Sequence, residues 1–156
     1  MIAVDTVRDI AIMDFDLEEF LPYLLNQAAE VTSRSFHAIY AEKYGMTRTQ
    51  WRVLANLGKF GSMSAKDICE ISHMEKTKVS RAISALEATK LLRRKTMSDD
   101  RRAEALHLTA TGLKVYKELG MSALHYDHKL RVLLGRAAFE NLSRTLKVLA
   151  RQKNAA

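Results

Sequence analysis

A helix pattern followed at once by a hairpin pattern constrains the fold of this chain more than any other feature. Residues 75–89 have the apolar spacing of an amphipathic helix, and its other face carries Lys, Arg and hydroxyl side chains. Two runs with strand-like alternation follow, 91–97 and 103–109, and they flank the charged turn 98–102. A new helix pattern begins at Thr109. This order predicts a winged helix-turn-helix, which can place a helix in the major groove of DNA and a loop in the adjacent minor groove.

The distribution of charge agrees with that outline. The 156 residues carry 25 Lys and Arg against 18 Asp and Glu, a formal net charge of +7. A basic balance fits a nucleic-acid partner, although many basic proteins bind none. Residues 75–102 hold nine Lys and Arg against four Asp and Glu, so the excess is concentrated in the segment with the groove-reading outline. We therefore expect double-stranded DNA as a partner.

Composition excludes several other classes of protein. Hydrophobic residues make up 47% of the chain, enough for a packed core. The single cysteine, Cys69, excludes an internal disulfide and any metal site built on several cysteines. No secretory segment and no bilayer-length apolar run is apparent, so we expect a cytoplasmic protein that does not enter a membrane. No nucleophile elbow, zinc-protease motif, Walker loop or dinucleotide fingerprint occurs, and we expect neither an enzyme nor a cofactor.

The pattern predicts one domain, residues 1–156, that is mainly α with a small β-hairpin wing. The winged lobe should span about 47–112. Helices over about 16–44 and 110–153 are apolar on more than one side, so they need a second subunit as well as their own core. These helices predict a homodimer. Residues 1–15 lack a clear period and are either a loosely attached arm or a short extra helix.

Local signals predict where the helices begin and end. Pro22 marks either the start of the first long helix or a bend in it. Gly45 should end that helix, and Gly135 should separate the last two. The next two helices should open with capping boxes, formed by Thr47 with Gln50 and by Ser64 with Asp67.

The helix over residues 75–89 divides into two faces on a helical wheel. Four apolar residues form the core side: Val79, Ala82, Ile83 and Leu86. The opposite side is cationic and hydroxylated, with Thr77, Ser80, Arg81 and Ser84 between Lys76 and Lys78. Arg81 can reach a guanine edge with two hydrogen bonds, whereas lysines suit phosphates. The predicted DNA-binding residues are Ser64, Lys76, Thr77, Lys78, Ser80, Arg81, Ser84, Lys95, Asp100, Arg101 and Arg102.

Two rival interpretations of this helix stay open. An isolated amphipathic helix would carry a charged face simply because it is solvated. A winged-helix module that holds another protein would instead present an apolar face where this helix has Thr77, Lys78 and Arg81. The short preceding helix and the following hairpin favour the groove-reading role.

The predicted tip of the wing puts two acids before two bases. One arginine can enter a narrow minor groove, whose negative potential attracts it, while an aspartate holds its side chain. We expect Asp100 to be the positioning acid and either Arg101 or Arg102 to be the groove probe. A charged tip that only keeps the hairpin soluble is the alternative.

These residues resemble the multiple-antibiotic-resistance regulator (MarR) family. Asp100 and Arg102, then Leu108, Thr109 and Gly112, match its wing signature, D-x-R followed by L-T-x-x-G. The run 76–81 and the pair Leu86-Glu87 resemble its recognition helix, and the element order fits from about 17 to 151. The resemblance implies a homodimer on a pseudo-palindromic operator, repression of nearby genes, and release by a small aromatic or anionic ligand.

The chain departs from the family pattern at three points. Lys90 stands where the family has a glycine after the recognition helix, and Glu75 is a weak residue to begin that helix. The oxidation-sensing members have a cysteine near the start of the first long helix, and this chain has none there. Cys69 has a core-facing phase and is expected to be packing.

The resemblance also directs attention to a ligand site between the lobe and the dimer region. Candidate lining residues are His37, Tyr40, Trp51, Arg52 and Met63, with a carboxylate as the favoured ligand if Arg52 or His37 takes part. Trp51 and Tyr40 are more often core residues, and Arg52 more often pairs with an acid or a phosphate. His125 and His128 have metal-ligand spacing, but two exposed histidines on a polar helix are usually bystanders, so we expect no metal.

Overall fold

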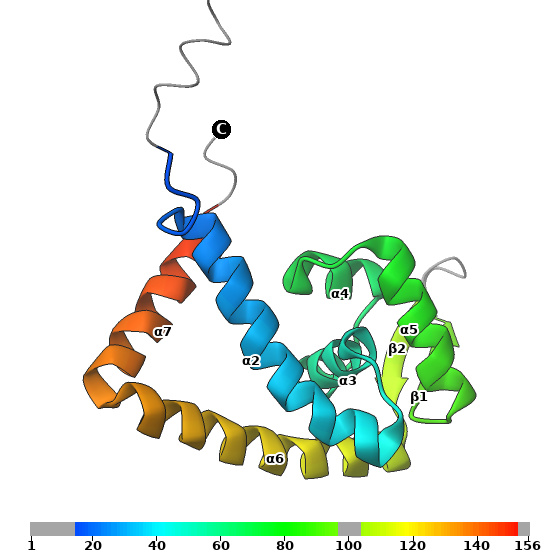
Figure 1. Cartoon of the computed structure of the whole chain (residues 1–156). Helices are drawn as coiled ribbons and strands as arrows, with labels where there is room; N and C mark the ends of the chain where they lie inside the picture. The colour runs from blue at the N-terminus through cyan, green and yellow to red at the C-terminus, as the bar shows by residue number, and fades with distance from the viewer. Residues whose placement is uncertain (1–14, 97–103, 153–156) are drawn as a thin grey trace, which may run out of the picture. The chain divides into compact units, whose positions relative to one another are not determined.

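The computed structural model describes residues 15–96 and 104–152. Helices dominate the described part, and two short strands there form an antiparallel hairpin. Figure 1 shows the elements in chain order: α2 (Leu21–Tyr44), α3 (Arg48–Phe60), α4 (Ala65–Ser72), α5 (Lys76–Ala88), β1 (Leu92–Thr96), β2 (Glu104–Leu108), α6 (Ala110–Leu134) and α7 (Arg136–Arg151). The predicted mainly α fold with a β-hairpin wing is confirmed.

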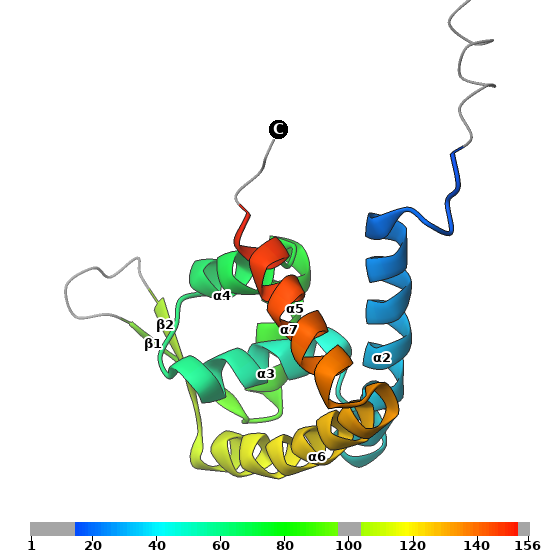
Figure 2. The same ribbon diagram turned by 90° about the vertical axis from the view of Figure 1, so that its left-hand side faces the viewer.

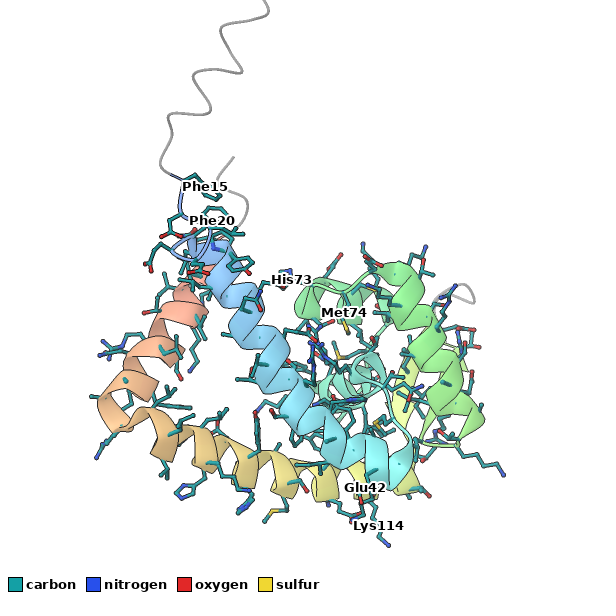
Figure 3. The ribbon with its side chains drawn as sticks, viewed as in Figure 1. Phe15, Phe20, Glu42, His73, Met74 and Lys114 are labelled. Atoms are coloured by element: carbon teal, nitrogen blue, oxygen red, sulfur yellow. The ribbon has the colours of Figure 1, made fainter. Side chains whose placement is uncertain are left out.

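Backbone contacts divide the chain into two compact units, residues 1–35 and residues 36–156. In the first unit the rings of Phe15 and Phe20 meet edge to face, with centroids 5.5 Å apart (Figure 3). Helix α2 begins at Leu21 and not near Asp16, so of the two roles predicted for Pro22 the start of the helix is confirmed, and Pro22 lies in the first turn. Its missing N–H costs nothing there, because the first N–H groups of a helix have no intrahelical partner. Residues 1–14 of the predicted arm lie outside the described residues.

In the second unit, α3 is the central element of the lobe. It contacts α4, α5, α6 and β2, and both views show it between these elements (Figures 1 and 2). Its buried side chains are Val53, Leu54 and Leu57. Val53 and Leu54 are fully buried, whereas Trp51 and Ala55 are half-buried. Apolar burial of this kind stabilises by about 1.5–3 kcal/mol per large side chain.

Both predicted capping boxes are present. The hydroxyls of Thr47 and Ser64 accept from the backbone N–H groups of Gln50 and Asp67, and each N3 side chain accepts from its N-cap backbone. Hydrogen bonds from Ser64 hold the pKa of the Asp67 carboxyl below its ordinary value. Gly45 follows α2 with φ +60°, the left-handed conformation that suits glycine. The starts of α3 and α4 are therefore set by local sequence, as predicted.

The hairpin is the wing of the predicted fold. β1 and β2 pair antiparallel with Leu92 opposite Leu108 and Thr96 opposite Glu104, and the ribbon projects from the lobe in Figure 2. Met63 pairs with Leu106 in a single antiparallel bridge, with backbone bonds in both directions. The loop before α4 is thus fixed to the base of the wing.

The L-T-x-x-G run (Leu108, Thr109 and Gly112) lies at the start of α6, and its threonine and glycine have structural roles there. The Thr109 hydroxyl accepts from the Gly112 N–H at 2.9 Å and donates to the Lys90 carbonyl at 2.8 Å, while the Thr109 N–H donates to the Leu91 carbonyl at 3.0 Å. A Cβ on Gly112 would lie 1.8 Å from the Leu91 carbonyl oxygen. Thr109 and Gly112 therefore hold the helix start against the strand that begins the wing.

Helices α6 and α7 complete the second unit. Gly135, at φ +79°, separates them as predicted. Within the described helices, none is both long and apolar enough to cross a bilayer.

Lys90, the second residue after the end of α5, adopts a conformation that suits glycine. Lys90 has φ +59°, and its N–H donates to the Glu87 carbonyl. This chain therefore has a lysine in left-handed backbone where the MarR family has a glycine. That conformation costs an L-residue about 1–2 kcal/mol.

Replacing Lys90 with glycine is expected to stabilise the protein. Glycine adopts φ > 0 freely, but it also gives the unfolded chain more freedom, so the net gain should be about 0.5–1 kcal/mol in the free energy of unfolding. Urea denaturation measures it. Lys90→Ala is the control, since it removes the side chain but keeps the strain; an equal gain from both variants would contradict the backbone explanation.

Candidate nucleic-acid interface

A short turn joins α4 to α5 in helix-turn-helix fashion. Ser72 ends α4, and His73 follows at φ +51°. The N–H groups of His73 and Met74 both donate to the Cys69 carbonyl, and both residues are labelled in Figure 3. Glu75 then precedes α5 without a side-chain cap from any described residue. Short helix, tight turn and second helix are the arrangement that presents α5 for recognition.

Helix α5 is sharply divided between a buried and an exposed side. The four residues predicted for the core, Val79, Ala82, Ile83 and Leu86, are all buried. The six predicted for DNA on this helix are all exposed: Lys76, Thr77, Lys78, Ser80, Arg81 and Ser84. The helical period alone produces this division, because residues three and four apart share a face.

The exposed side of α5 carries two cations that are not ion-paired within the described part of the chain. Lys76 and Arg81 form no ion pair with another described residue. Lys78 lies 3.5 Å from a carboxylate oxygen of Glu75, a weak surface pair, and the Ser84 hydroxyl donates to the Ser80 carbonyl. Arg81, with no acidic partner among the described residues and small hydroxyl residues beside it, is suited to a groove lined with acceptors.

An arginine that sequence reasoning did not single out connects the wing to α5. Arg94 of β1 bonds Glu87 of α5 through Nε and Glu104 of β2 through Nη1, each at 3.0 Å. The two carboxylates, first Glu104 and then Glu87, raise the pKa of the Arg94 guanidinium. We name this group the wing clasp (Glu87, Arg94, Glu104). It fixes the strand of the wing relative to the end of the recognition helix.

Removal of the wing clasp should lower the free energy of unfolding. The clasp is partly exposed, so Arg94→Met is expected to cost only about 1 kcal/mol in the free energy of unfolding. Urea denaturation in low salt and in 1 M NaCl should show a smaller cost at high salt, where charges are screened. Arg93→Met is the matched control, because Arg93 is exposed on the same strand and pairs with no described acid. Equal effects from the two variants would contradict a specific clasp.

The remaining predicted DNA contacts fall in three places. Lys95 is exposed on β1 opposite Ala105. Ser64 is half-buried, and its hydroxyl is engaged with Asp67 in the cap of α4. Asp100, Arg101 and Arg102 lie outside the described residues, so their roles stay predictions.

A second group of predicted residues contributes to an aromatic cluster in the second unit, formed by Phe36, His37, Tyr40, Trp51 and Tyr126. Tyr40 stacks on Trp51 with centroids 5.8 Å apart, and Phe36 stacks on Tyr126 at 5.6 Å. His37 meets Tyr40 edge to face at 5.1 Å. Burial raises the pKa of the Tyr40 phenol. His37, Tyr40 and Trp51 thus lie in one cluster with Phe36 and Tyr126, and their role in binding a ligand stays a prediction.

The other two candidate ligand residues serve the fold. Met63 is buried, and its backbone is paired with Leu106. Arg52 forms no ion pair with an acid among the described residues; its guanidinium donates to the Ser72 carbonyl at the end of α4. That contact joins residues 20 positions apart, a separation that helical periodicity does not predict.

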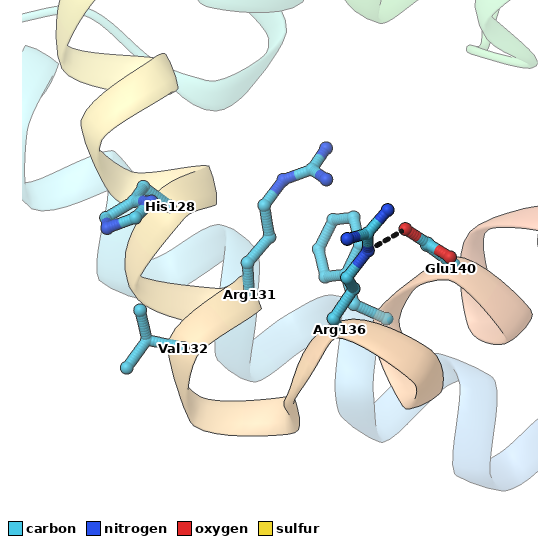
Figure 4. Close-up of a pocket in the computed structure, with 6 residues that line it drawn as sticks. His128, Arg131, Val132, Arg136 and Glu140 are labelled. Atoms are coloured by element: carbon cyan, nitrogen blue, oxygen red, sulfur yellow. Dashed lines mark hydrogen bonds and ion pairs between the residues drawn. The ribbon is translucent and has the colours of Figure 1, made fainter.

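The elbow between α6 and α7 contains a cavity of about 430 Å³ (Figure 4). Arg131 lies over the Phe139 ring and pairs with Asp127, and Arg136 pairs with Glu140. Both arginines are thus paired with acids of their own helices, which favours a structural role for the elbow. His125 and His128 are exposed on α6, and among residues 15–96 and 104–152 no three His, Cys, Asp or Glu side chains are grouped to hold a metal.

Comparisons with known proteins agree with this geometry. Residues 44–103 match the sequence model of the MarR family. The HTH-type transcriptional regulator YwoH of Bacillus subtilis is 28% identical over 110 residues, which cover 70% of this chain and 79% of YwoH. The solved structure of Bordetella bronchiseptica BpsR, whose DNA binding is regulated by 6-hydroxynicotinic acid, has a TM-score of 0.80 at 22% identity and covers 89% of this chain and 99% of that one. The structure of NadR in complex with 4-hydroxyphenylacetate has a TM-score of 0.71 at 28% identity, over 83% of this chain and 91% of NadR.

The fold and the exposed cationic face of α5 define a winged helix-turn-helix DNA-binding protein. The matches to sequence and structure narrow the class further. Residues 44–103 match the MarR family, and the chain as a whole is similar in sequence and fold to MarR-family DNA-binding transcriptional regulators.

Proposed function

We propose that this protein is a repressor that binds a pseudo-palindromic operator as a homodimer, with α5 of each subunit in a major groove and each wing at a minor groove. The observation that carries the proposal is the exposed side of α5, where Arg81 and Lys76 keep their donors while Val79 and Ile83 anchor the helix in the core. The Arg81 guanidinium then reads a base edge and the lysines contact phosphates.

The apolar surface of a single chain supports the homodimer. In the first unit, Leu17, Phe20, Leu21, Leu24 and Val31 are all exposed. In the second unit, α7 buries none of its residues, and Leu142, Leu146 and Val148 are exposed on it. Exposed apolar groups in such numbers mark an interaction surface, and a second copy of the chain presents the same surface in return.

We further propose that a small aromatic acid releases the protein from DNA by binding at the aromatic cluster. BpsR and NadR share the fold. The DNA binding of BpsR is regulated by 6-hydroxynicotinic acid, and the NadR structure is a complex with 4-hydroxyphenylacetate. The rings of Trp51 and Tyr40 offer stacking surfaces, and His37 offers a polar group beside them. The protein acts in the cytoplasm and performs no catalysis.

A titration at several salt concentrations tests the DNA-binding mode. The probes are mixed-sequence duplex DNA and a duplex selected from a random pool by the protein itself. Affinity for both should fall steeply with salt, with log K falling by about 0.9 per log unit of salt for each phosphate neutralised. The selected duplex should bind more tightly at every salt concentration and should carry two related half-sites. Affinity independent of salt, or equal affinity for both probes, would refute a sequence-specific regulator. Sizing chromatography of the free protein tests the dimer separately.

A further inference from the structure

A long-range hydrogen bond fixes the turn before the recognition helix. Arg52 lies on α3, and its guanidinium donates to the backbone carbonyl of Ser72, the last residue of α4. Ser72 is itself buried, and its hydroxyl donates back to the Ile68 carbonyl. The end of α4 is therefore tied both to its own helix and to α3.

The position of this bond is suited to controlling α5. The last carbonyls of a helix lack intrahelical partners and carry partial negative charge, so a guanidinium is a favourable partner there. The next residue, His73, is in the left-handed conformation, and Glu75 gives α5 no side-chain cap. Within the described residues, Arg52 is thus the side chain from outside α4 that bonds the backbone where this helix turns toward α5.

We propose that Arg52 is a positioning residue for DNA recognition. It fixes the turn at residues 73–75 through the Ser72 carbonyl, so that Arg81 and its neighbours meet the base edges in one orientation. Base contacts depend on the exact placement of α5, whereas phosphate contacts by flexible lysines tolerate small shifts. Arg52 therefore contributes to specific binding and little to non-specific binding. The inference rests on the proposed role of α5 in reading DNA.

The test measures the affinity of each variant for two DNA probes, the selected duplex and mixed-sequence DNA. Arg52→Met keeps an apolar stem and removes the guanidinium, and Lys59→Met removes one positive charge from an exposed position on the same helix. Relative to Lys59→Met, we expect Arg52→Met to bind the duplex selected by the wild-type protein about tenfold more weakly. The affinities of Arg52→Met and Lys59→Met for mixed-sequence DNA should agree within about twofold. Arg52→Lys, which keeps a charged donor, should recover part of the loss.

Amide hydrogen exchange supplies a readout that a general loss of charge would not change. In Arg52→Met the His73 and Met74 amides should exchange faster, while the amides of α3 and the emission of the single tryptophan, Trp51, stay as in the wild type. Loss of helical circular dichroism would overturn the inference, because Arg52 would then maintain the whole lobe. Equal losses for both DNA probes would also overturn it.

Arg81→Ala, measured in parallel, separates this inference from the proposed function. If Arg81→Ala loses discrimination and Arg52→Met keeps it, the inference alone fails. If both variants keep full discrimination, the role of α5 in reading bases fails, and the inference fails with it.

Discussion

Gly112→Ala is expected to lower the free energy of unfolding by about 3 kcal/mol, the upper end of the usual cost of overpacking. The added Cβ would lie 1.8 Å from the Leu91 carbonyl oxygen and 2.8 Å from its carbon, both backbone atoms. Neither can move easily, because the Leu91 carbonyl accepts from the Thr109 N–H at 3.0 Å. The start of α6 and the start of the wing would have to separate. A loss of this size is a large fraction of the 5–15 kcal/mol typical of a folded domain.

Urea denaturation followed by circular dichroism measures that loss, and Gly120→Ala is the matched control. Gly120 lies in the same helix, and a Cβ there would meet nothing within 4 Å. Alanine has the higher helix propensity, so Gly120→Ala should be neutral or stabilising by up to about 1 kcal/mol. Two variants of equal stability would contradict the close approach of α6 to Leu91.

Arg81→Ala is expected to cost about 1–3 kcal/mol in binding to the selected operator duplex and to relax the preference at one base position. Arg81 is exposed on the side of α5 opposite Val79 and Ile83, so its loss should leave the fold intact. The slope of log K against log salt should stay nearly constant. By contrast, Lys78→Ala should weaken binding to all sequences alike and reduce that slope by about 1, as a lost phosphate contact does.

Selection from a random duplex pool by each variant measures the preference directly. Arg136→Ala is the control for a lost arginine, because Arg136 is 91% exposed on α7, outside the lobe. Unchanged discrimination in Arg81→Ala would show that another side chain reads the base. A preference relaxed equally by Arg136→Ala would show that net charge, and not a base contact, is responsible.

The features that sequence reasoning predicted correctly depend on neighbours in the chain. The capping boxes at Thr47 and Ser64 and the glycine end at Gly45 each involve residues within one helical turn. The division of α5 into a buried and an exposed face follows from its period alone. Such signals are readable in a single sequence because their geometry is set by the backbone of one element.

The features that sequence reasoning missed are contacts between distant elements. No local pattern in the chain indicates the partners of Arg94, because only the fold brings Glu87 and Glu104 beside it. Arg52 was a candidate ligand residue, with an acid or a phosphate as its alternative partner, and the fold brings it to a backbone carbonyl 20 residues away. Long side chains reach several partners, and only the packing of α3, α4 and the hairpin decides which partner is within reach.

The sequence by itself determined that residues 76–88 form a helix with one apolar side and one cationic, hydroxylated side, since periodicity and propensity act locally. Tertiary structure decided how that helix is held: by Arg52 at the turn before it and by the wing clasp at its end. The physical reason is that hydrogen bonds and ion pairs need partners within about 3 Å, and only the folded backbone brings residues of separate elements that close.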